Sequence, residues 1–444
     1  MKINNLIIGG GLSGITIATH LWKRSAEFLL LESAPRLGGK IETKMTPEAS
    51  YEFGPNSFTN QTEEILELLE LLGLGPEILE PSRSSKKRFI LKRGKITQLP
   101  SKPPEILTTK ALTFGGRLRF LREFFYTPPR PSGEESAWDF FERHFGREVA
   151  DYFVDPFVSG IFAGDAKKIS LAQAFPTMAE AEGKSESLLR YLISQRKTAR
   201  TTPQSYQLKN GLESIFHRFL KQVGDEKIRL SEKVQEISPD GNKFRVVTDK
   251  AEYETSRLYL TTPAYVSAPL LKKNFAGLAA PLSAIDYAPV ITIHLKVPQS
   301  ENYPFDGFGI LIPSSEERKI LGVLWNSGSF PSLFPDKRHH YLTVYAGGAR
   351  QRELVQEDEN RVKAIILNEV QQIFDLRAEP ILIHLRRHHQ AIPQYNLGYG
   401  KILKALEENL KNCPNLKLAG NYIGGISMPK TVTSAKRTVV SDDF

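Results

Sequence analysis

The feature that most constrains this chain is a glycine-rich turn close to its start. Leu6–Ile8 reads as a short strand, and Gly9, Gly11 and Gly14 follow it in a G-x-G-x-x-G pattern that opens a helix. A second strand-like run ends on Glu32. In such a turn the glycines let a pyrophosphate approach the helix N-terminus, and the acid accepts hydrogen bonds from ribose hydroxyls. We therefore predict a dinucleotide site for FAD or NAD rather than NADP, with a purely structural glycine turn as the alternative.

The residues that follow Glu32 favour a flavin. Arg36, Gly38, Gly39 and Lys40 complete an E-S-x-x-R-x-G-G-K pattern, which resembles the second flavin-contact segment of the FAD-dependent amine oxidase-like superfamily. Paired glycines expose backbone amides to an anionic group, although an ordinary glycine turn would have the same composition. The run "FGPNSF" (residues 53–58) resembles the superfamily's loop near the isoalloxazine ring.

Composition excludes several classes of protein. The 444 residues carry a net charge of +9 and a single cysteine, Cys413. One cysteine excludes an intramolecular disulfide and cysteine-based zinc or iron–sulfur sites. No nucleic-acid-binding motif accompanies the positive charge, so we expect an anionic membrane surface or an acidic substrate as its partner. No apolar window of about 18 residues exists, so we expect neither a membrane-spanning helix nor a signal peptide, and we expect a cytoplasmic protein.

The pattern along the chain predicts elements of different types. A helix is expected over residues 63–72, a strand pair over residues 86–100 and a helical region from residue 103 to about 205. Strands are expected within residues 228–264 and 287–347, and a helix over residues 358–374. The C-terminal part reads as a strand, a glycine loop and a short helix.

One apolar stretch does not fit a regular element. "VDPFVSGIFAGD" (residues 154–165) contains Pro156, Gly160 and Gly164, which are unfavourable inside a helix. Its apolar side chains would be exposed in a surface loop. We therefore interpret it as a buried, shaped turn.

This stretch resembles the corresponding segment of the oxygen-dependent protoporphyrinogen oxidases, the flavoenzymes of haem biosynthesis. Further similar segments follow in the same order, and together they span nearly the whole chain: "RFILKRGKITQLP", "YQLKNGLESIFHRF", "AIPQYNLGY" and "AGNYIGGISMP". Two positions depart from the family. Tyr399 stands where the family usually has His, and Ala435 stands where it usually has Gly. We expect the Ala435 methyl group to crowd the pyrophosphate or the flavin.

The resemblance implies an α/β fold with interleaved domains. A Rossmann-like FAD-binding domain would comprise residues 1–85, 206–285 and 405–444. An antiparallel-sheet α+β substrate domain would comprise residues 86–102 and 286–404, and a helical, membrane-associating domain would comprise residues 103–205. The cofactor contacts that follow are Gly9, Gly11, Leu12, Ser13, Gly14, Glu32, Ser33, Arg36, Gly38, Gly39, Lys40, Gly54, Pro55, Asn56, Ser57, Val234, Gly420, Asn421, Gly425 and Ile426.

The implied substrate is a porphyrinogen, bound by Arg88, Phe157, Gly160, Phe162, Leu311 and Trp325. Arg88 would hold a propionate through its guanidinium, and the other residues would form an apolar cavity wall. A solvated arginine at position 88 and plain strand core at Leu311 and Trp325 are the alternatives. The family chemistry needs no acid–base residue, so we predict none.

The resemblance implies oxidation of protoporphyrinogen IX to protoporphyrin IX through FAD, with oxygen as the acceptor and hydrogen peroxide as the by-product. Alternatives are oxidation of coproporphyrinogen III, another flavin-dependent oxidation of an amine or a polyene, and a non-enzymatic relative. The sequence leaves open whether the chain forms a homodimer. The motif "RRHHQ" (residues 386–390), with His384 nearby, lacks a carboxylate partner, so we predict a polar strand end and no metal.

The region from Pro103 to Phe125 carries an apolar stripe at helical spacing, formed by Phe114, Leu118, Leu121 and Phe125. The basic residues Lys110, Arg117, Arg119 and Arg122 are interspersed with it. A basic amphipathic helix of this kind can lie on an anionic bilayer, and the resemblance also implies peripheral membrane attachment through this region. A core-facing helix with solvated basic residues is the alternative.

Overall fold

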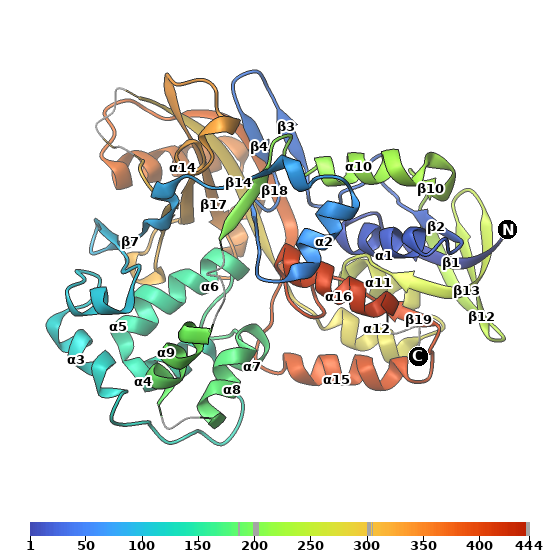
Figure 1. The fold of residues 1–444 in the computed structure, drawn as a ribbon, viewed down its shortest axis with the longest axis horizontal. Helices are drawn as coiled ribbons and strands as arrows, with labels where there is room; N and C mark the ends of the chain where they lie inside the picture. Colours follow the sequence, from blue (N-terminus) through green and yellow to red (C-terminus); the bar gives the residue numbers. More distant parts are fainter. Residues whose placement is uncertain (185–186, 199–203, 300–302, 304, 441–444) are drawn as a thin grey trace.

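The computed structural model describes residues 1–184, 187–198, 204–299, 303 and 305–440. Two seven-stranded sheets dominate these residues, and a group of helices forms a third body beside them (Figure 1). The mixed α/β fold expected from the sequence is confirmed. No described helix is both long enough and apolar enough to span a membrane. The three domain boundaries given above remain predictions.

The first sheet is assembled from segments that are far apart in the sequence. Its parallel strands are β1 (Lys2–Ile8), β2 (Phe28–Leu31), β10 (Ile228–Arg229), β13 (Glu252–Leu260) and β19 (Leu416–Leu418). The strands β11 (Val234–Asp240) and β12 (Lys243–Thr248) extend it in antiparallel fashion. Its central strands are apolar on both faces because helices cover both faces.

The side-chain alternation of β1 shows the two layers. Ile7 packs in the cluster formed with α1 (Leu12–Lys23), α2 (Glu63–Leu71), α10 (Ser214–Val223) and α16 (Met428–Val440). Leu6 and Ile8 pack in the opposite cluster, with α11 (Ala264–Leu271), α12 (Ala276–Ser283) and α15 (Tyr399–Leu410). Successive strand residues point to opposite faces, so this strand contributes to two cores.

The second sheet has the order β18-β14-β17-β16-β15-β7-β8. The bounds are Ile381–Pro393 for β18, Tyr287–Pro298 for β14, His339–Gly347 for β17, Ile320–Trp325 for β16, Gly309–Leu311 for β15, Arg88–Lys92 for β7 and Lys95–Gln98 for β8. All neighbours are antiparallel except the parallel pair β15 and β7. The helix α14 (Glu359–Phe374) covers one face, where its Ile366 packs with Ile293 and Val344. The predicted strand pair and the predicted helix over residues 358–374 are confirmed.

Two small sheets accompany the two large ones. The strands β3 (Thr43–Met45) and β4 (Ser50–Glu52) form one of them. The strand β9 (Ser205–Leu208) joins β5 (Phe58–Thr59) to β6 (Ile78–Leu79) in the other. The short helix α13 (Asn326–Ser329) follows β16.

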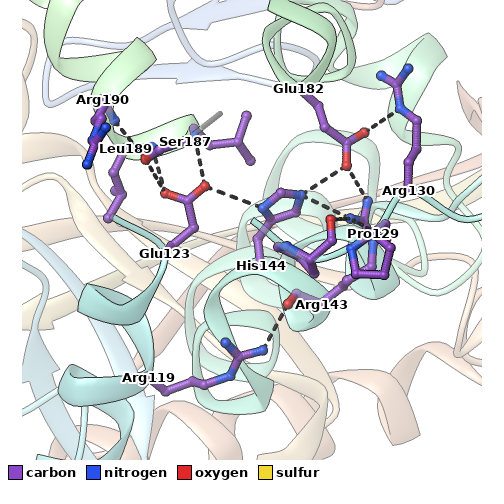
Figure 2. Close-up of polar contacts among 12 residues, drawn as sticks. Arg119, Glu123, Pro129, Arg130, Arg143, His144, Glu182, Ser187, Leu189 and Arg190 are labelled. Atoms are coloured by element: carbon purple, nitrogen blue, oxygen red, sulfur yellow. Dashed lines mark hydrogen bonds and ion pairs between the residues drawn. The ribbon is translucent and has the colours of Figure 1, made fainter. Parts of the chain in front are cut away.

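The helical body contains α3 (Phe114–Arg122), α4 (Ala137–Phe145), α5 (Arg147–Val149), α6 (Asp155–Phe162), α7 (Leu171–Ala174), α8 (Pro176–Lys184) and α9 (Leu188–Thr198). A buried polar cluster ties four of these helices together (Figure 2). Glu123, at the end of α3, accepts hydrogen bonds from the backbone N–H groups of Leu188 and Leu189, at 2.6 and 2.9 Å. His144 of α4 lies between Glu123 and Glu182 of α8. The carboxylate of Glu123 therefore holds the start of α9 on α3 and α4.

The prediction of an irregular turn at residues 154–165 is wrong, because Asp155–Phe162 forms α6. Pro156 lies in the first turn of α6, where proline is tolerated. Gly160 lies inside this helix and packs closely on Leu311, since a Cβ atom there would lie 2.7 Å from a methyl carbon of Leu311. Ala163 ends the helix at a positive φ of 47°. The stretch is also not wholly buried, since 46% of Phe157 and 38% of Ile161 are exposed.

Candidate functional site

The predicted glycine turn connects β1 to α1. Gly9 has a φ of 109°, which favours glycine. A Cβ atom on Gly14 would overlap the carbonyl oxygen of Gly9, whereas one on Gly11 would meet nothing within 4 Å. No described side chain caps the first amides of α1, at Leu12 and Ser13. The turn is therefore closed on its inner side and open at Gly11, where an anionic group can reach the helix N-terminus.

Glu32 follows β2 and lies against this turn. Its Oε2 atom accepts a hydrogen bond from the Gly10 N–H at 2.7 Å, and its Oε1 atom accepts from the Ala34 N–H at 2.7 Å. The Ser33 hydroxyl donates to Oε1 at 3.3 Å. These bonds fix a carboxylate at the end of the strand, as recognition of a ribose requires. Val234 is buried at the start of β11, two residues after Glu232, whose N–H donates to the Glu32 carbonyl at 3.0 Å.

The second glycine segment packs directly against the first. The Gly38 N–H donates to the Gly10 carbonyl at 2.9 Å, and a Cβ atom on Gly39 would lie 3.7 Å from the Gly11 Cα. Both Gly38 and Gly39 have positive φ angles, of 118° and 56°. The structure therefore brings together the two segments that the sequence analysis assigned to one cofactor.

The Arg36 side chain forms hydrogen bonds to the backbone of the second segment. Its guanidinium donates to the carbonyls of Leu37, Gly39 and Ile41 and to the carboxylates of Glu42 and Glu213. We predicted a cofactor contact for Arg36. These bonds hold the glycine loop in shape, and the cofactor contact of Arg36 stays a prediction.

Lys40 connects the second segment to the second sheet. Its Nζ atom donates to the Ala391 carbonyl at 2.6 Å and lies over the rings of Tyr265 and Tyr287, at 5.6 and 5.2 Å from their centres. Burial lowers the pKa of Lys40 to about 8. The ammonium is thus a buried donor between the glycine loop and the end of β18.

The third segment is the loop that follows β4. Gly54 lies so close to Lys40 that a Cβ atom there would overlap the Lys40 carbonyl oxygen. The loop continues through Pro55, Asn56 and Ser57. The Asn56 Oδ1 atom accepts from the Asn326 side-chain amide at 3.0 Å, and the Asn56 carbonyl accepts from Gln207 Nε2 at 2.8 Å. The loop therefore spans from the glycine segments to the second sheet.

The fourth segment follows β19. Gly424 and Gly425 have φ angles of 83° and 124°. The Tyr395 hydroxyl donates to the Asn421 carbonyl at 2.8 Å and accepts from the Gly425 N–H at 3.0 Å. Gly420 begins this segment, and the half-buried Ile426 ends it against the core beneath α11 and α15.

Ala435 lies in α16, which packs against α1. The side chain is fully buried in the core shared with Leu12 and Ile15. We expected its methyl group to crowd the cofactor. Because it packs in this core, it does not face the open side of the glycine turn.

One face of the second sheet carries the predicted substrate residues that lie together. Gly309 is paired with Arg88, and Leu311, two residues further along β15, packs against Gly160 of α6. Arg88 and Leu311 therefore share a face, which we call the substrate-side face, opposite the face covered by α14. Arg88 is exposed, with its guanidinium 4.8 Å from the centre of the Phe308 ring. Phe157 projects from the neighbouring helix and is exposed.

Trp325 lies on the other face. Val323 pairs with Ile310, so Val323 and Trp325 share the face that packs on α14. Trp325 is 1% exposed and contacts Phe89, Phe305 and Phe374. Trp325 therefore fits the alternative given for it above, which is a residue in the core beneath the strand. Leu324, which was not among the predicted residues, pairs with Gly309 and is half-buried on the substrate-side face.

Phe162 is also buried, at 4% exposure. Its ring lies 5.9 Å from that of Tyr395 and 6.3 Å from that of Phe175. The Phe162 side chain therefore packs on the side of α6 that faces Tyr395, the tyrosine that holds the fourth segment. Its contact with a ligand stays a prediction that this packing does not favour.

His388 of "RRHHQ" and the nearby His384 contact the third segment and the strand before it. The Nε2 atom of His388 lies 2.8 Å from the Phe53 carbonyl, at the start of the third segment. His384 contacts the rings of Tyr51 and Phe53. Across the described part of the chain, no group of three or more His, Cys, Asp or Glu side chains could hold a metal ion.

The four segments together fit FAD. An open helix N-terminus at Gly11 suits the pyrophosphate, and the fixed Glu32 carboxylate suits the ribose. The second segment packs on the same turn, and the third segment packs on the second. The substrate-side face lies next to the third segment, which Asn326 contacts at the end of β16. The arrangement can therefore place an apolar substrate beside a bound flavin.

Comparison with known proteins agrees with this arrangement. The family described as flavin containing amine oxidoreductase matches residues 12–441. Protoporphyrinogen oxidase 2 of Arabidopsis thaliana is 28% identical, over 96% of this chain and 91% of that protein. The coproporphyrinogen III oxidase of Bacillus subtilis (strain 168) is 26% identical, over 99% of this chain and 97% of that protein. A solved structure from Exiguobacterium sp. 255-15, provisionally named a protoporphyrinogen oxidase, superposes with a TM-score of 0.86 at 22% identity, covering 99% of this chain and 98% of that one.

Proposed function

Because this chain belongs to the flavin containing amine oxidoreductase family and is an FAD-dependent oxidase, we propose that it oxidises protoporphyrinogen IX to protoporphyrin IX. Relatives named for this reaction support the proposal, and they cover nearly the whole chain. The name of the Bacillus subtilis relative supports the alternative substrate, coproporphyrinogen III.

The proposed reaction removes six electrons and six protons from the macrocycle. Bound FAD supplies two-electron chemistry, so three turnovers and three molecules of oxygen account for the product and three molecules of hydrogen peroxide. The protein has to bind a large apolar ring and orient it towards the flavin.

The observation that carries the proposal is the composition of the substrate-side face. Leu311 and Leu324 lie on it, and Phe157 and Ile161 of α6 are exposed beside it. Apolar walls of this kind suit a tetrapyrrole ring. A substrate with fixed charge along its length would lose hydration on such a surface without compensation.

Charge on the same face favours a substrate with few carboxylates. Arg88 is exposed there and has no carboxylate partner among the described residues. Arg386, which also lies on this face, is bound to Glu42 through two hydrogen bonds. One available guanidinium suits the two propionates of protoporphyrinogen better than the four of coproporphyrinogen.

We also propose that the chain attaches peripherally to anionic membranes through the surface around α3. Phe114 is 70% exposed and Phe125 is 87% exposed, and Leu118 is exposed between them. Lys110 and Arg122 are exposed beside these side chains. Apolar side chains flanked by basic residues are typical of interfacial anchors, and a membrane would hold the apolar substrate.

The first experiment is anaerobic mixing of the FAD-loaded protein with each porphyrinogen, followed through bleaching of the flavin absorption at about 450 nm. Rapid bleaching by protoporphyrinogen IX, with porphyrin fluorescence once oxygen is admitted, is expected. Faster bleaching by coproporphyrinogen III would assign the alternative substrate. No bleaching by either compound would overturn porphyrinogen oxidation.

A further inference from the structure

Two histidines of the second sheet contact the backbone where β4 passes into the third segment. We call Glu52, the last residue of β4, together with residues 53–57 of that segment the flavin loop. The Nε2 atom of His388, on β18, lies 2.8 Å from the Phe53 carbonyl. The Nε2 atom of His294, on β14, lies 3.0 Å from the Glu52 carbonyl. Consecutive carbonyls at one end of the loop are therefore paired with ring nitrogens from two neighbouring strands.

A carbonyl can only accept, so both Nε2 atoms must carry the proton and donate. Burial lowers the pKa of His294 to about 3. Burial also lowers the pKa of His388, with Lys40 and Arg386 acting in the same direction, while its bond to Phe53 and the charge of Glu42 oppose the shift. Both rings are thus neutral imidazoles with a single N–H, and each directs that N–H to the loop.

The opposite end of the loop is held by the residue that directly follows β16 of the same sheet. The Asn326 side chain, directly after β16, donates to the Asn56 side chain at 3.0 Å. Between these anchors, Gly54 is pressed against the carbonyl of Lys40 in the second glycine segment. The flavin loop therefore contacts the second glycine segment on one side. On the other side it contacts the sheet whose substrate-side face carries Arg88 and Leu311.

We infer that His388 and His294 are positioning residues, which set the place of the flavin loop, and so of the flavin ring, relative to the substrate-side face. The inference rests on FAD being the cofactor and deepens the proposed function. His388 of the "RRHHQ" motif would then place the flavin through the flavin loop, without itself contacting the substrate.

The test compares three variants of the FAD-loaded protein. His388→Leu removes the N–H, and His388→Gln replaces it with an amide N–H at a similar reach. His389→Leu changes the exposed neighbour on the same strand, whose side chain makes no hydrogen bond within the described residues. The readouts are the flavin midpoint potential, by photoreduction against a reference dye, and the FAD dissociation constant, by flavin fluorescence.

We expect His388→Leu to raise the FAD dissociation constant about tenfold, because a buried carbonyl loses its donor, and to shift the midpoint potential. His388→Gln should restore both values towards wild type, and His389→Leu should leave them unchanged. The inference would be overturned if His388→Leu had the wild-type midpoint potential and FAD dissociation constant. It would also be overturned if His389→Leu changed both quantities as much as His388→Leu does.

If His388→Leu does not fold, His388→Asn replaces it in the comparison with His388→Gln. The two amides are equally polar, but the shorter one cannot reach the Phe53 carbonyl, so only His388→Asn should shift the potential. Neither readout uses a porphyrinogen. A failure of the proposed substrate would therefore leave these results standing, and a failure of the positioning role would leave the substrate assignment standing.

Discussion

The Tyr399 hydroxyl donates a hydrogen bond of 2.7 Å to the backbone carbonyl of Tyr422, inside the fourth cofactor segment. The ring of Tyr399 stacks on that of Tyr395 at 4.4 Å, and Tyr395 bonds to Asn421 and Gly425 in the same segment. Two tyrosines four residues apart therefore hold one glycine loop. This gives Tyr399, which departs from the family pattern, a defined structural role.

Replacing Tyr399 with Phe should weaken FAD binding. The ring stack can persist, but the Tyr422 carbonyl loses its donor, which costs about 1–3 kcal/mol for a buried group. We expect the FAD dissociation constant to rise about tenfold, measured by flavin fluorescence. Tyr341→Phe is the control, because this tyrosine lies on β17 and its hydroxyl donates to Asp336, outside the four cofactor segments. An unchanged constant in Tyr399→Phe would show that the bond does not support the cofactor.

Replacing Arg88 with Ala should raise the KM for protoporphyrinogen about tenfold or more, since a charged hydrogen bond to a propionate contributes about 1.5–3 kcal/mol. The flavin spectrum and the FAD dissociation constant should stay at wild-type values. Arg88→Lys should give an intermediate KM, because an ammonium does not form the paired bonds of a guanidinium. Steady-state kinetics on each variant measure the effect. A wild-type KM in Arg88→Ala would identify Arg88 as a solvated surface residue.

Membrane attachment predicts a dependence on the exposed aromatic side chains around α3. The double change Phe114→Ser and Phe125→Ser should reduce co-sedimentation with vesicles rich in anionic lipid several-fold, because each exposed ring loses its insertion into the interface. Wild-type binding should fall as salt rises, owing to the basic residues. Leu397→Ser, at an exposed apolar position outside this surface, is the control. Equal sedimentation of all three proteins would reject this surface as the anchor.

The stability of the protein should fall as the pH rises towards 8 because of Glu52. Burial raises the pKa of Glu52 from 4.5 to about 8, although bonds from Leu212, Thr43 and Gln207 oppose the shift. A raised pKa in the folded state contributes stability below pH 4.5, and this contribution is lost as the pH rises from 4.5 to about 8. Glu52→Gln should flatten the slope of thermal stability over this window, measured by calorimetry. The exposed Glu48→Gln should keep the wild-type slope.

The buried cluster of the helical body predicts a large loss of stability in Glu123→Ala. This change leaves the N–H groups of Leu188 and Leu189 without their acceptor and removes the carboxylate beside the His144 ring, so a loss of about 3 kcal/mol or more is expected. Glu180→Ala removes only an exposed pair with Lys184 and should cost less than about 1 kcal/mol. Thermal unfolding in the FAD-loaded protein measures both. Equal melting temperatures for the two variants would contradict the structural role of Glu123.

Features that depend on near neighbours in the chain could be predicted from the amino-acid sequence alone. The turn at Gly9, Gly11 and Gly14, the position of Glu32 and the helix over residues 359–374 follow from local spacing, because backbone conformation and helix periodicity are set within a few residues. The wrong interpretation of residues 154–165 shows the limit of this reasoning. Proline and glycine disfavour a helix on average, but α6 gains close packing of Gly160 on Leu311, a contact that no local pattern contains.

Which residues face the site became evident from the folded structure and not from the sequence. Strand register placed Trp325 in the core and Leu324 on the substrate-side face, although both belong to one short strand. The bond between His388 and the Phe53 carbonyl joins residues 335 positions apart. Contacts of this kind arise when sheets and loops assemble from distant segments, so the side chains that shape the flavin site depend on pairings that a single sequence does not encode locally.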